Sequence, residues 1–150
     1  MKKILVAAMV LGLLAMGGAA WAADTQVTVT AVVTGTCQFL TEGTIDFALD
    51  PSTGGDVIGV VSQPTFWCTK NSSYTITDDD GDNASGTTHQ MKHATLNEFI
   101  PYSFTYTDTG TGGGRSTTIT LDIASTVVDA DYANVSEGTY SDTVTLTVNP

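Results

Sequence analysis

The chain has little positive charge. Its 150 residues include five Lys and Arg against 16 Asp and Glu, which gives a formal net charge of −11 at pH 7. Proteins that bind nucleic acids through phosphates need a basic patch, and five bases are too few to build one beside so many acids. This composition therefore excludes nucleic acid as an expected partner.

Helix-forming patterns are also scarce. Threonine supplies 27 residues and glycine 15, whereas charged residues make up only 14%. No window after residue 23 combines an apolar repeat of 3.6 residues with a cap and a stop. Threonine-rich segments favour strands, and 41% apolar residues argue against disorder. The length and composition predict one all-β domain.

No hydrophobic run is long enough to span a membrane. The apolar run at the N-terminus covers 13 residues, Ile4 to Met16, whereas a span needs about 20. Lys2 and Lys3 precede it, and the small-x-small site Ala20-Trp21-Ala22 follows. This order is typical of a secretory signal peptide, predicted here over 1–22. Its removal leaves three bases against 16 acids, a net charge of −13.

Only two cysteines are present, Cys37 and Cys68. An exported chain enters an oxidising compartment, where a cysteine pair usually forms a disulfide. Two thiols without matching histidines do not fit a zinc site. We therefore expect the single possible bridge, Cys37–Cys68. Closing this loop is worth roughly 3–4 kcal/mol.

Catalytic and metal-binding patterns are few. The sequence has two histidines and no Gly-x-Ser-x-Gly motif, so we expect neither an enzyme nor a cofactor. His89 and His93 are four residues apart, but we expect a loop or hairpin there rather than a metal-binding helix. Asp78, Asp80 and Asp82 form a candidate calcium cluster. Asn83 stands where an EF-hand needs glycine, so the pattern favours a solvated turn.

Apolar and polar residues alternate along most of the chain after residue 23. Such alternation predicts strands with one face on a core and one in water. The clearest candidates are 26–33, 102–106, 119–123 and 139–148, with shorter ones at 37–40, 44–47, 57–61, 65–69 and 74–77. Turn-forming clusters separate them at 50–55, 78–86, 108–114 and 136–138. Many short strands with regular turns predict a β-sandwich.

The clearest alternating strands lie at the two ends of the mature chain. The segment 25–33 precedes Cys37, and 139–148 runs almost to the C-terminus. A long strand left at a terminus is an exposed edge unless it finds a partner, and 25–36 contains neither Lys nor Pro to protect it. Two interpretations stay open: 25–33 is the first strand of its own sandwich, or it pairs with another molecule by β-strand addition.

The ordered pieces of the mature chain resemble a known family. The stretch from Gln26 to Cys37, Gln-Val-Thr-Val-Thr-Ala-Val-Val-Thr-Gly-Thr-Cys, is similar to the N-terminal extension and first cysteine of archaic chaperone–usher pilins, which share the spore coat protein U domain. Phe66-Trp67-Cys68-Thr69-Lys70 resembles the second-cysteine strand of that family. The tail from Gly138 to Val148 is similar to its closing strand. The family's next strand and its Pro-Tyr segment are resembled by 74–77 and 100–108.

The resemblance implies an immunoglobulin-like, pilin-type β-sandwich that lacks its last strand. A donor strand from a neighbouring subunit would complete it. In this interpretation 23–36 is the donor-strand extension and 37–150 the pilin domain. The donor side chains are Val27, Val29, Ala31 and Val33, and the acceptor and chaperone-binding strand carries Tyr140, Val144, Leu146 and Val148.

The implied function is that of a structural subunit of a bacterial surface fibre, built by donor-strand exchange and supporting adhesion or biofilm formation. The expected partners are a periplasmic chaperone, an outer-membrane usher and other pilin subunits joined head to tail. The chain would be exported to the periplasm and then reach the cell surface. The alternative is a free-standing secreted β-sandwich that binds calcium or a glycan.

Overall fold

In a computed structural model of the chain, residues 22–150 are described. They fall into a segment that ends at Val32 and a compact unit, Val33–Pro150. The predicted signal peptide lies outside the described residues except for Ala22. Among the described residues, no helix is long and apolar enough to cross a bilayer.

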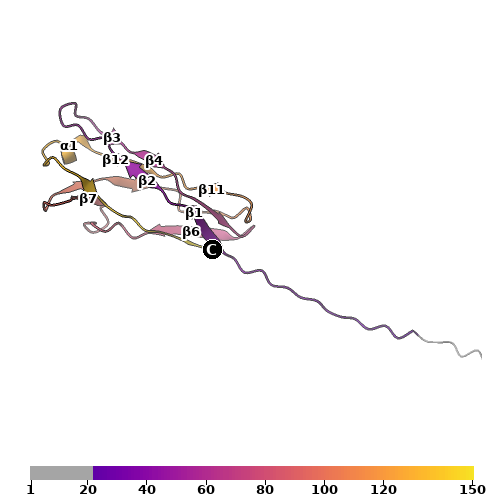
Figure 1. Cartoon of the computed structure of the whole chain (residues 1–150). Helices are drawn as coiled ribbons and strands as arrows, with labels where there is room; N and C mark the ends of the chain where they lie inside the picture. Colours follow the sequence, from indigo (N-terminus) through magenta and orange to yellow (C-terminus); the bar gives the residue numbers. More distant parts are fainter. Residues whose placement is uncertain (1–21) are drawn as a thin grey trace, which may run out of the picture. The chain divides into compact units, whose positions relative to one another are not determined.

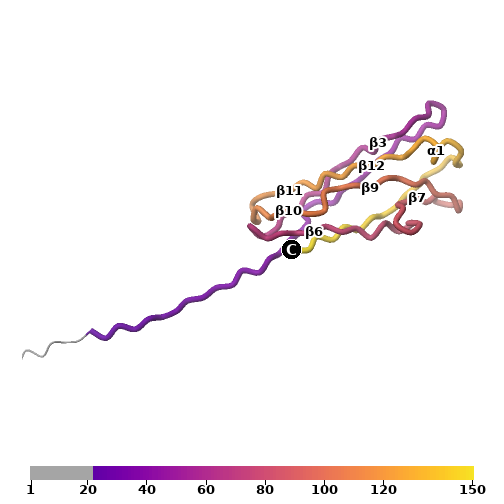
Figure 2. The backbone as a smooth tube through the Cα atoms, turned by 180° about the vertical axis from the view of Figure 1, so that it is seen from behind, coloured from indigo at the N-terminus to yellow at the C-terminus, as the bar shows by residue number. Residues whose placement is uncertain are grey.

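The segment before Val33 forms no helix or strand, and its residues 22–32 are all exposed. It runs as an extended trace, which Figure 2 shows clearly for this segment taken by itself. Val27 and Val29 are 82% and 87% exposed. The predicted strand over 25–33 therefore does not form in the single chain.

The compact unit is all-β, as predicted, and has two layers of antiparallel strands. Figure 1 shows β3, β4, β11 and β12 in one layer and β6 and β7 in the other. The first layer contains β1 (Cys37–Thr41), β2 (Thr44–Asp46), β3 (Val57–Ile58), β4 (Val60–Ser62), β5 (Thr65–Cys68), β9 (Ser103–Thr105), β11 (Ile119–Thr120) and β12 (Ala124–Val127). The second contains β6 (Ser73–Asp78), β7 (Gln90–His93), β8 (Phe99–Pro101), β10 (Thr109–Thr111), β13 (Tyr140–Ser141) and β14 (Leu146–Asn149).

Hydrogen-bonded pairing gives each layer a definite order. In the first layer β1 pairs with β5, β5 with β11, β2 with β4, and β12 with both β3 and β9. In the second layer β6 lies between β10 and β14, and β7 lies between β13 and β8. The C-terminal strands β13 and β14 therefore follow one another along a single edge of the second layer, and β1 and β2 follow one another along an edge of the first.

Two apolar clusters fill the space between the layers. In the larger one, Phe66 and Cys68 of β5 pack with Ile76 of β6, and all three are at most 2% exposed. The Phe66 ring meets the Tyr74 ring edge-on, with centroids 5.1 Å apart. The second cluster surrounds Ile100 and Tyr132. Period-2 alternation produces this core because every second side chain of each strand points inward.

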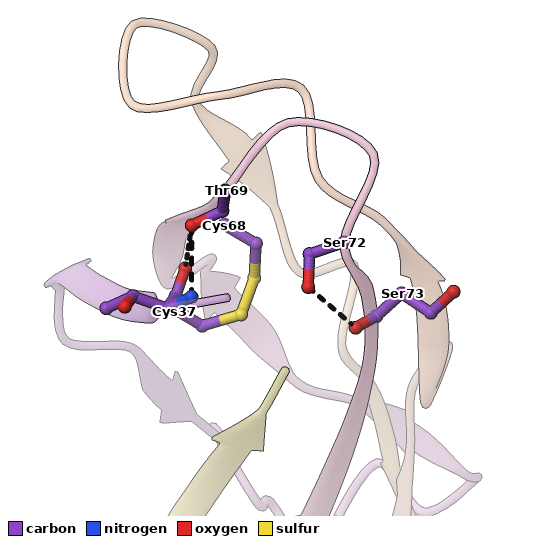
Figure 3. The surroundings of a disulfide bond; sticks show 6 residues. Cys37, Cys68, Thr69, Ser72 and Ser73 are labelled. Carbon is purple, nitrogen blue, oxygen red and sulfur yellow. Dashed lines mark hydrogen bonds between the residues drawn. A yellow bond between two sulfur atoms is a disulfide. The ribbon is translucent and has the colours of Figure 1, made fainter. Parts of the chain in front are cut away.

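Cys37 and Cys68 form the predicted disulfide (Figure 3), which joins directly opposed residues of β1 and β5. The backbone pairing continues one residue beyond β1. Thr69 donates its N–H to the Thr36 carbonyl at 2.8 Å, and the Thr36 N–H donates to the Thr69 hydroxyl at 3.0 Å. The start of the compact unit is therefore fixed to β5 by both covalent and hydrogen bonds.

Several local predictions need correction. The predicted turn at 108–114 contains β10, because Thr109–Thr111 pairs with β6. The predicted strand 57–61 is divided at Gly59, and 119–123 forms a strand only over β11 before the chain continues into β12. The C-terminal strand is interrupted between Ser141 and Leu146. One short helix, α1 (Asp129–Tyr132), follows β12, and its four residues are too few to show a helical repeat in the sequence.

The hairpin predicted around His93 is present, formed by β7 and β8. His93 holds its connecting loop: its Nδ1 accepts the N–H groups of Thr95 and Leu96 at 3.1 and 3.0 Å. Its Nε2 then donates to the Glu137 carbonyl at 3.1 Å, which places the ring proton on Nε2. Both histidines are buried, His89 at 8% and His93 at 7% exposure, so neither belongs to a polar surface segment.

Removing the disulfide tests its contribution to the fold. A Cys37→Ala, Cys68→Ala variant should lose roughly 3–4 kcal/mol of unfolding free energy, because the cross-link restricts the unfolded chain. Urea unfolding of the two proteins, prepared in the same way, measures the difference. Equal midpoints would show that the bridge does not stabilise the domain.

Acid should destabilise the fold through Glu98. The Ser136 N–H and hydroxyl, each 2.9 Å from a Glu98 carboxylate oxygen, and the Tyr140 hydroxyl hold the pKa of Glu98 below its usual 4.5. The resulting stability is present above pH 4.5 and is lost as the pH falls through the lower folded-state pKa. Glu98→Gln should therefore lower the melting temperature at pH 7 and reduce its fall in acid.

Glu137→Gln is the matched control, since within residues 22–150 the Glu137 carboxylate makes no hydrogen bond and its carbonyl still accepts His93. Melting curves from pH 7 to acid compare the three proteins. Identical pH dependence of the wild type and the Glu98→Gln variant would contradict the assignment.

Candidate functional site

An apolar groove of about 860 Å³ runs along one side of the compact unit. One wall is the chain from Phe39 to Phe47, which covers the end of β1, all of β2 and the turn between them. The other wall is 142–146, the link from β13 into β14. The two walls belong to different layers, so the groove lies where the sandwich is open.

The floor of the groove is the core itself. Phe39 and Ile45 line it from the first wall, Val61 and Ile123 from the first layer, and Phe104 from β9. Phe39 also packs on the buried Phe66 ring at 5.6 Å between centroids. Apolar surface of this extent is normally covered in a finished sandwich.

Both walls are strand edges with a free side. Among the described residues β1 pairs only with β5 and β2 only with β4. In the other layer β14 pairs only with β6, and β13 only with β7. Each wall therefore presents backbone N–H and C=O groups toward the groove, which is the arrangement that accepts an added strand.

The interruption between β13 and β14 is held by the loop that follows β6. The Asp82 N–H donates to the Thr143 carbonyl at 3.0 Å, and the Thr145 N–H donates to the Asp79 carboxylate at 2.8 Å. The Val144 amide and carbonyl, which lie between them, have no hydrogen-bond partner within residues 22–150. The backbone N–H and carbonyl of Val144 therefore remain free to bond with a strand placed in the groove.

Asp142 anchors this wall from inside. Its Oδ1 accepts the Asn83 N–H at 3.1 Å and the Asn83 side-chain amide at 3.0 Å, and its Oδ2 accepts the Tyr102 hydroxyl at 2.7 Å. Burial, followed by the hydrogen bond to the Asp142 carboxyl group, raises the pKa of Tyr102. Gly81, at φ 90°, lies so close to Asp142 that any side chain there would collide with the carboxylate.

The predicted acceptor residues lie on the inward face as a set. Tyr140, Val144, Leu146 and Val148 are all partly buried, with exposed residues between them. Val144 and Leu146 line the groove, whereas Tyr140 packs on the second cluster and Val148 on the first. Their role in binding a partner remains a prediction.

Two features of the site were missed from sequence. Asp142 shares the parity of Tyr140 and Val144 and lines the groove, but an aspartate on the apolar face was not expected. The first wall, 39–47, carries the alternation of an ordinary strand. Its parity, with Phe39, Ile45 and Phe47 turned inward, predicts which face meets the core but not that the segment is an edge.

The candidate metal ligands are only partly brought together. Asp78 and Asp80 lie together with His89, and their ligand atoms are all within 4.8 Å of one another. Asp82 is outside this group and His93 is engaged in its own loop. The candidate combinations, three aspartates or two histidines, therefore do not form among the described residues.

An apolar floor between two unpaired backbone edges suits one kind of occupant. An extended polypeptide can form backbone hydrogen bonds with both walls while every second side chain enters the groove. Apolar side chains suit such a position, because the floor is aromatic and aliphatic.

Comparison with known proteins gives structural neighbours and a family. One neighbour is the crystal structure of the CsuC–CsuE chaperone–tip adhesion subunit pre-assembly complex from the archaic chaperone–usher Csu pili of Acinetobacter baumannii. The two share 22% identity with a TM-score of 0.45, over 77% of this chain and 40% of that one. No curated protein matches the sequence at a significant level.

The model of the spore coat protein U domain matches residues 23–147, which is most of the chain. The match includes both cysteines, the two walls of the groove and the N-terminal segment. The chain therefore belongs to the spore coat protein U domain family.

Proposed function

We propose that this chain is a structural, non-enzymatic subunit of a bacterial surface fibre that is assembled by the chaperone–usher pathway through donor-strand exchange. The observation that carries the proposal is the open groove between the β1–β2 edge and the β13–β14 edge. Membership of the spore coat protein U domain family supports it, as does the resemblance of the sequence to archaic pilins.

The N-terminal segment has the pattern that the groove requires. An extended chain presents four of its apolar side chains on one face, those of Val27, Val29, Ala31 and Val33. The residues between them are Thr28, Thr30 and Val32. The four apolar positions span about 20 Å at 3.3 Å per residue, so the donor would cover the 142–146 wall, about 13 Å long, and continue along β14. In the single chain this segment forms no strand, which supports its use between subunits.

Burial of apolar surface would drive insertion of the N-terminal segment into the groove. Covering four small apolar side chains and the floor beneath them removes about 300 Å² of apolar surface from water. At 25 cal/mol per Å² this is roughly 7 kcal/mol, to which the backbone hydrogen bonds on both walls add. A subunit without an occupant should aggregate, because it exposes both the floor and two edges.

The proposed route follows from this instability. A secretory signal over 1–22 exports the chain to the periplasm, where a chaperone lends a strand to the groove. At the outer-membrane usher, the extension 23–36 of the next subunit replaces that strand. The contact is head to tail and does not close on itself, so it produces a filament that supports adhesion or biofilm formation.

The donor face can be tested by adding charge. Val29→Asp together with Val33→Asp should abolish polymer, because two carboxylates would enter an apolar groove without partners. Thr28→Asp with Thr30→Asp places the same charge on the opposite face and should leave assembly close to normal. After co-expression with chaperone and usher, ladders in SDS gels of unheated samples measure polymer length. Normal ladders from the Val29, Val33 variant would refute the proposal.

The acceptor groove can be tested within one molecule. Moving residues 24–34 from the N-terminus to a position after Pro150, through a short flexible linker, should give a stable monomer that does not polymerise. Size-exclusion chromatography and thermal unfolding measure both properties. The same fusion carrying Val29→Asp should melt at a lower temperature. If the unmodified mature chain is already a stable lone monomer, the alternative of a free-standing binding module gains support.

A further inference from the structure

A second site lies where β6 ends and β7 begins. Asp78 is the last residue of β6, Asp80 is in the following loop, and His89 directly precedes β7. The three side chains offer one nitrogen and two carboxylate oxygens, all within 4.8 Å of one another. None of them takes part in the strand exchange proposed above, so this site does not rest on that function.

His89 is the unusual member of the group. The residue is only 8% exposed, and its ring lies against the rings of Tyr102 and Phe104, with centroids 5.5 and 5.1 Å away. Its Nε2 is buried and has no hydrogen-bond partner among the described residues. Buried polar atoms nearly always have a partner, so this nitrogen calls for an explanation.

The nearest acceptor to this nitrogen is a carboxylate that is already engaged. His89 Nε2 lies 3.3 Å from Asp78 Oδ1, but the two atoms are not aligned as a hydrogen bond. Asp78 Oδ1 accepts the Asp80 N–H at 3.0 Å, and Oδ2 accepts the Tyr106 hydroxyl at 2.6 Å. The two atoms are therefore close neighbours without a hydrogen bond between them.

Two hydrogen bonds hold the Asp78 carboxylate in place, because it accepts the Asp80 N–H at Oδ1 and the Tyr106 hydroxyl at Oδ2. The Tyr106 bond also fixes the orientation of the carboxylate, as partners behind metal ligands commonly do. Asp80 completes the group from a left-handed backbone conformation, at φ 62°.

We propose that His89, Asp78 and Asp80 form a binding site for a divalent transition-metal ion of the zinc type, with a water in the fourth position. Zinc takes imidazole nitrogen and carboxylate oxygen at about 2.0–2.2 Å in a tetrahedral arrangement, which separates neighbouring ligand atoms by about 3.3–3.6 Å. The His89–Asp78 separation of 3.3 Å matches this value. Calcium and magnesium take oxygen ligands, so the buried imidazole selects against both.

A bound ion would join three parts of the domain. It would tie the end of β6 and the loop after it to the start of β7, with Tyr102 and Phe104 enclosing the imidazole. The same loop holds the interrupted wall of the groove through Asp79, Asp82 and Asn83. Binding to the folded state alone stabilises it by mass action.

Titration of chelator-treated mature protein with Zn²⁺ tests the proposal. The mature chain is used as it is purified, whether monomeric or assembled, and binding is measured by isothermal titration calorimetry. We expect one equivalent per chain. Asp80→Asn should weaken binding by more than about tenfold, since even groups behind metal ligands contribute that much. Asp82→Asn removes the same charge from the same loop, outside the group, and should bind as the wild type does.

A second measurement identifies the nitrogen. Zn²⁺ should shift the side-chain ¹⁵N resonance of His89 Nε2 and leave that of His93 unchanged. His89→Leu preserves the aromatic packing and should remove the binding, and melting curves in chelator confirm that each variant is folded. Absence of saturable Zn²⁺ binding would overturn the proposal. Equal weakening by Asp80→Asn and Asp82→Asn would also overturn it, because binding would then be a general property of an acidic loop.

Discussion

The unpaired edges on either side of the groove are the constraint on which the rest of this structure depends. A two-layer sandwich is closed when each edge strand is either paired or shielded. Here β1 and β2 in one layer and β13 and β14 in the other leave matching free sides above the same apolar floor. The remaining strands form an ordinary core around Phe66 and Ile76, so the open side is localised and does not reflect a poorly packed domain.

The wall formed by the C-terminal strand is held in an unusual way. A continuous strand would be held by backbone hydrogen bonds to a neighbouring strand. Here, side chains and amides of the 78–83 loop bind the chain from Asp142 to Thr145 instead. Carboxylates take part in most of these bonds, since Asp142 accepts the two Asn83 donors and Asp79 accepts the Thr145 N–H. The acidity of the chain is therefore partly structural, in addition to any effect on solubility.

The sequence predicts those parts of the fold that depend on the order of residues within one strand and on the single cysteine pair. Alternation located β1, β5 and β6, and the two cysteines could pair in only one way. The inward parity of Tyr140, Val144, Leu146 and Val148 was also predictable, because side-chain direction in a strand has a strict period of two.

The rest depends on residues that are distant in the sequence. Thr109–Thr111 reads as part of a glycine-rich turn and becomes a strand only because β6 is beside it. The first wall of the groove could not be placed, since being an edge is a property of pairing and not of the segment. Asp142 on the groove face and the buried His89 have no local signal, because the residues that enclose them, Tyr102 and Phe104, lie far along the chain.

The position of the disulfide has a mechanical consequence. In the proposed fibre, tension on a subunit enters through the residues just before Cys37, where the extension joins β1. Cys37 is the first residue of β1 and is bonded to the opposed Cys68 in β5, whose side chain is completely buried. A pulling force is thus transferred at once from the first strand to a core strand through a covalent bond. Tension cannot peel β1 from the sheet one hydrogen bond at a time, and unfolding under load must shear the strands of the core together.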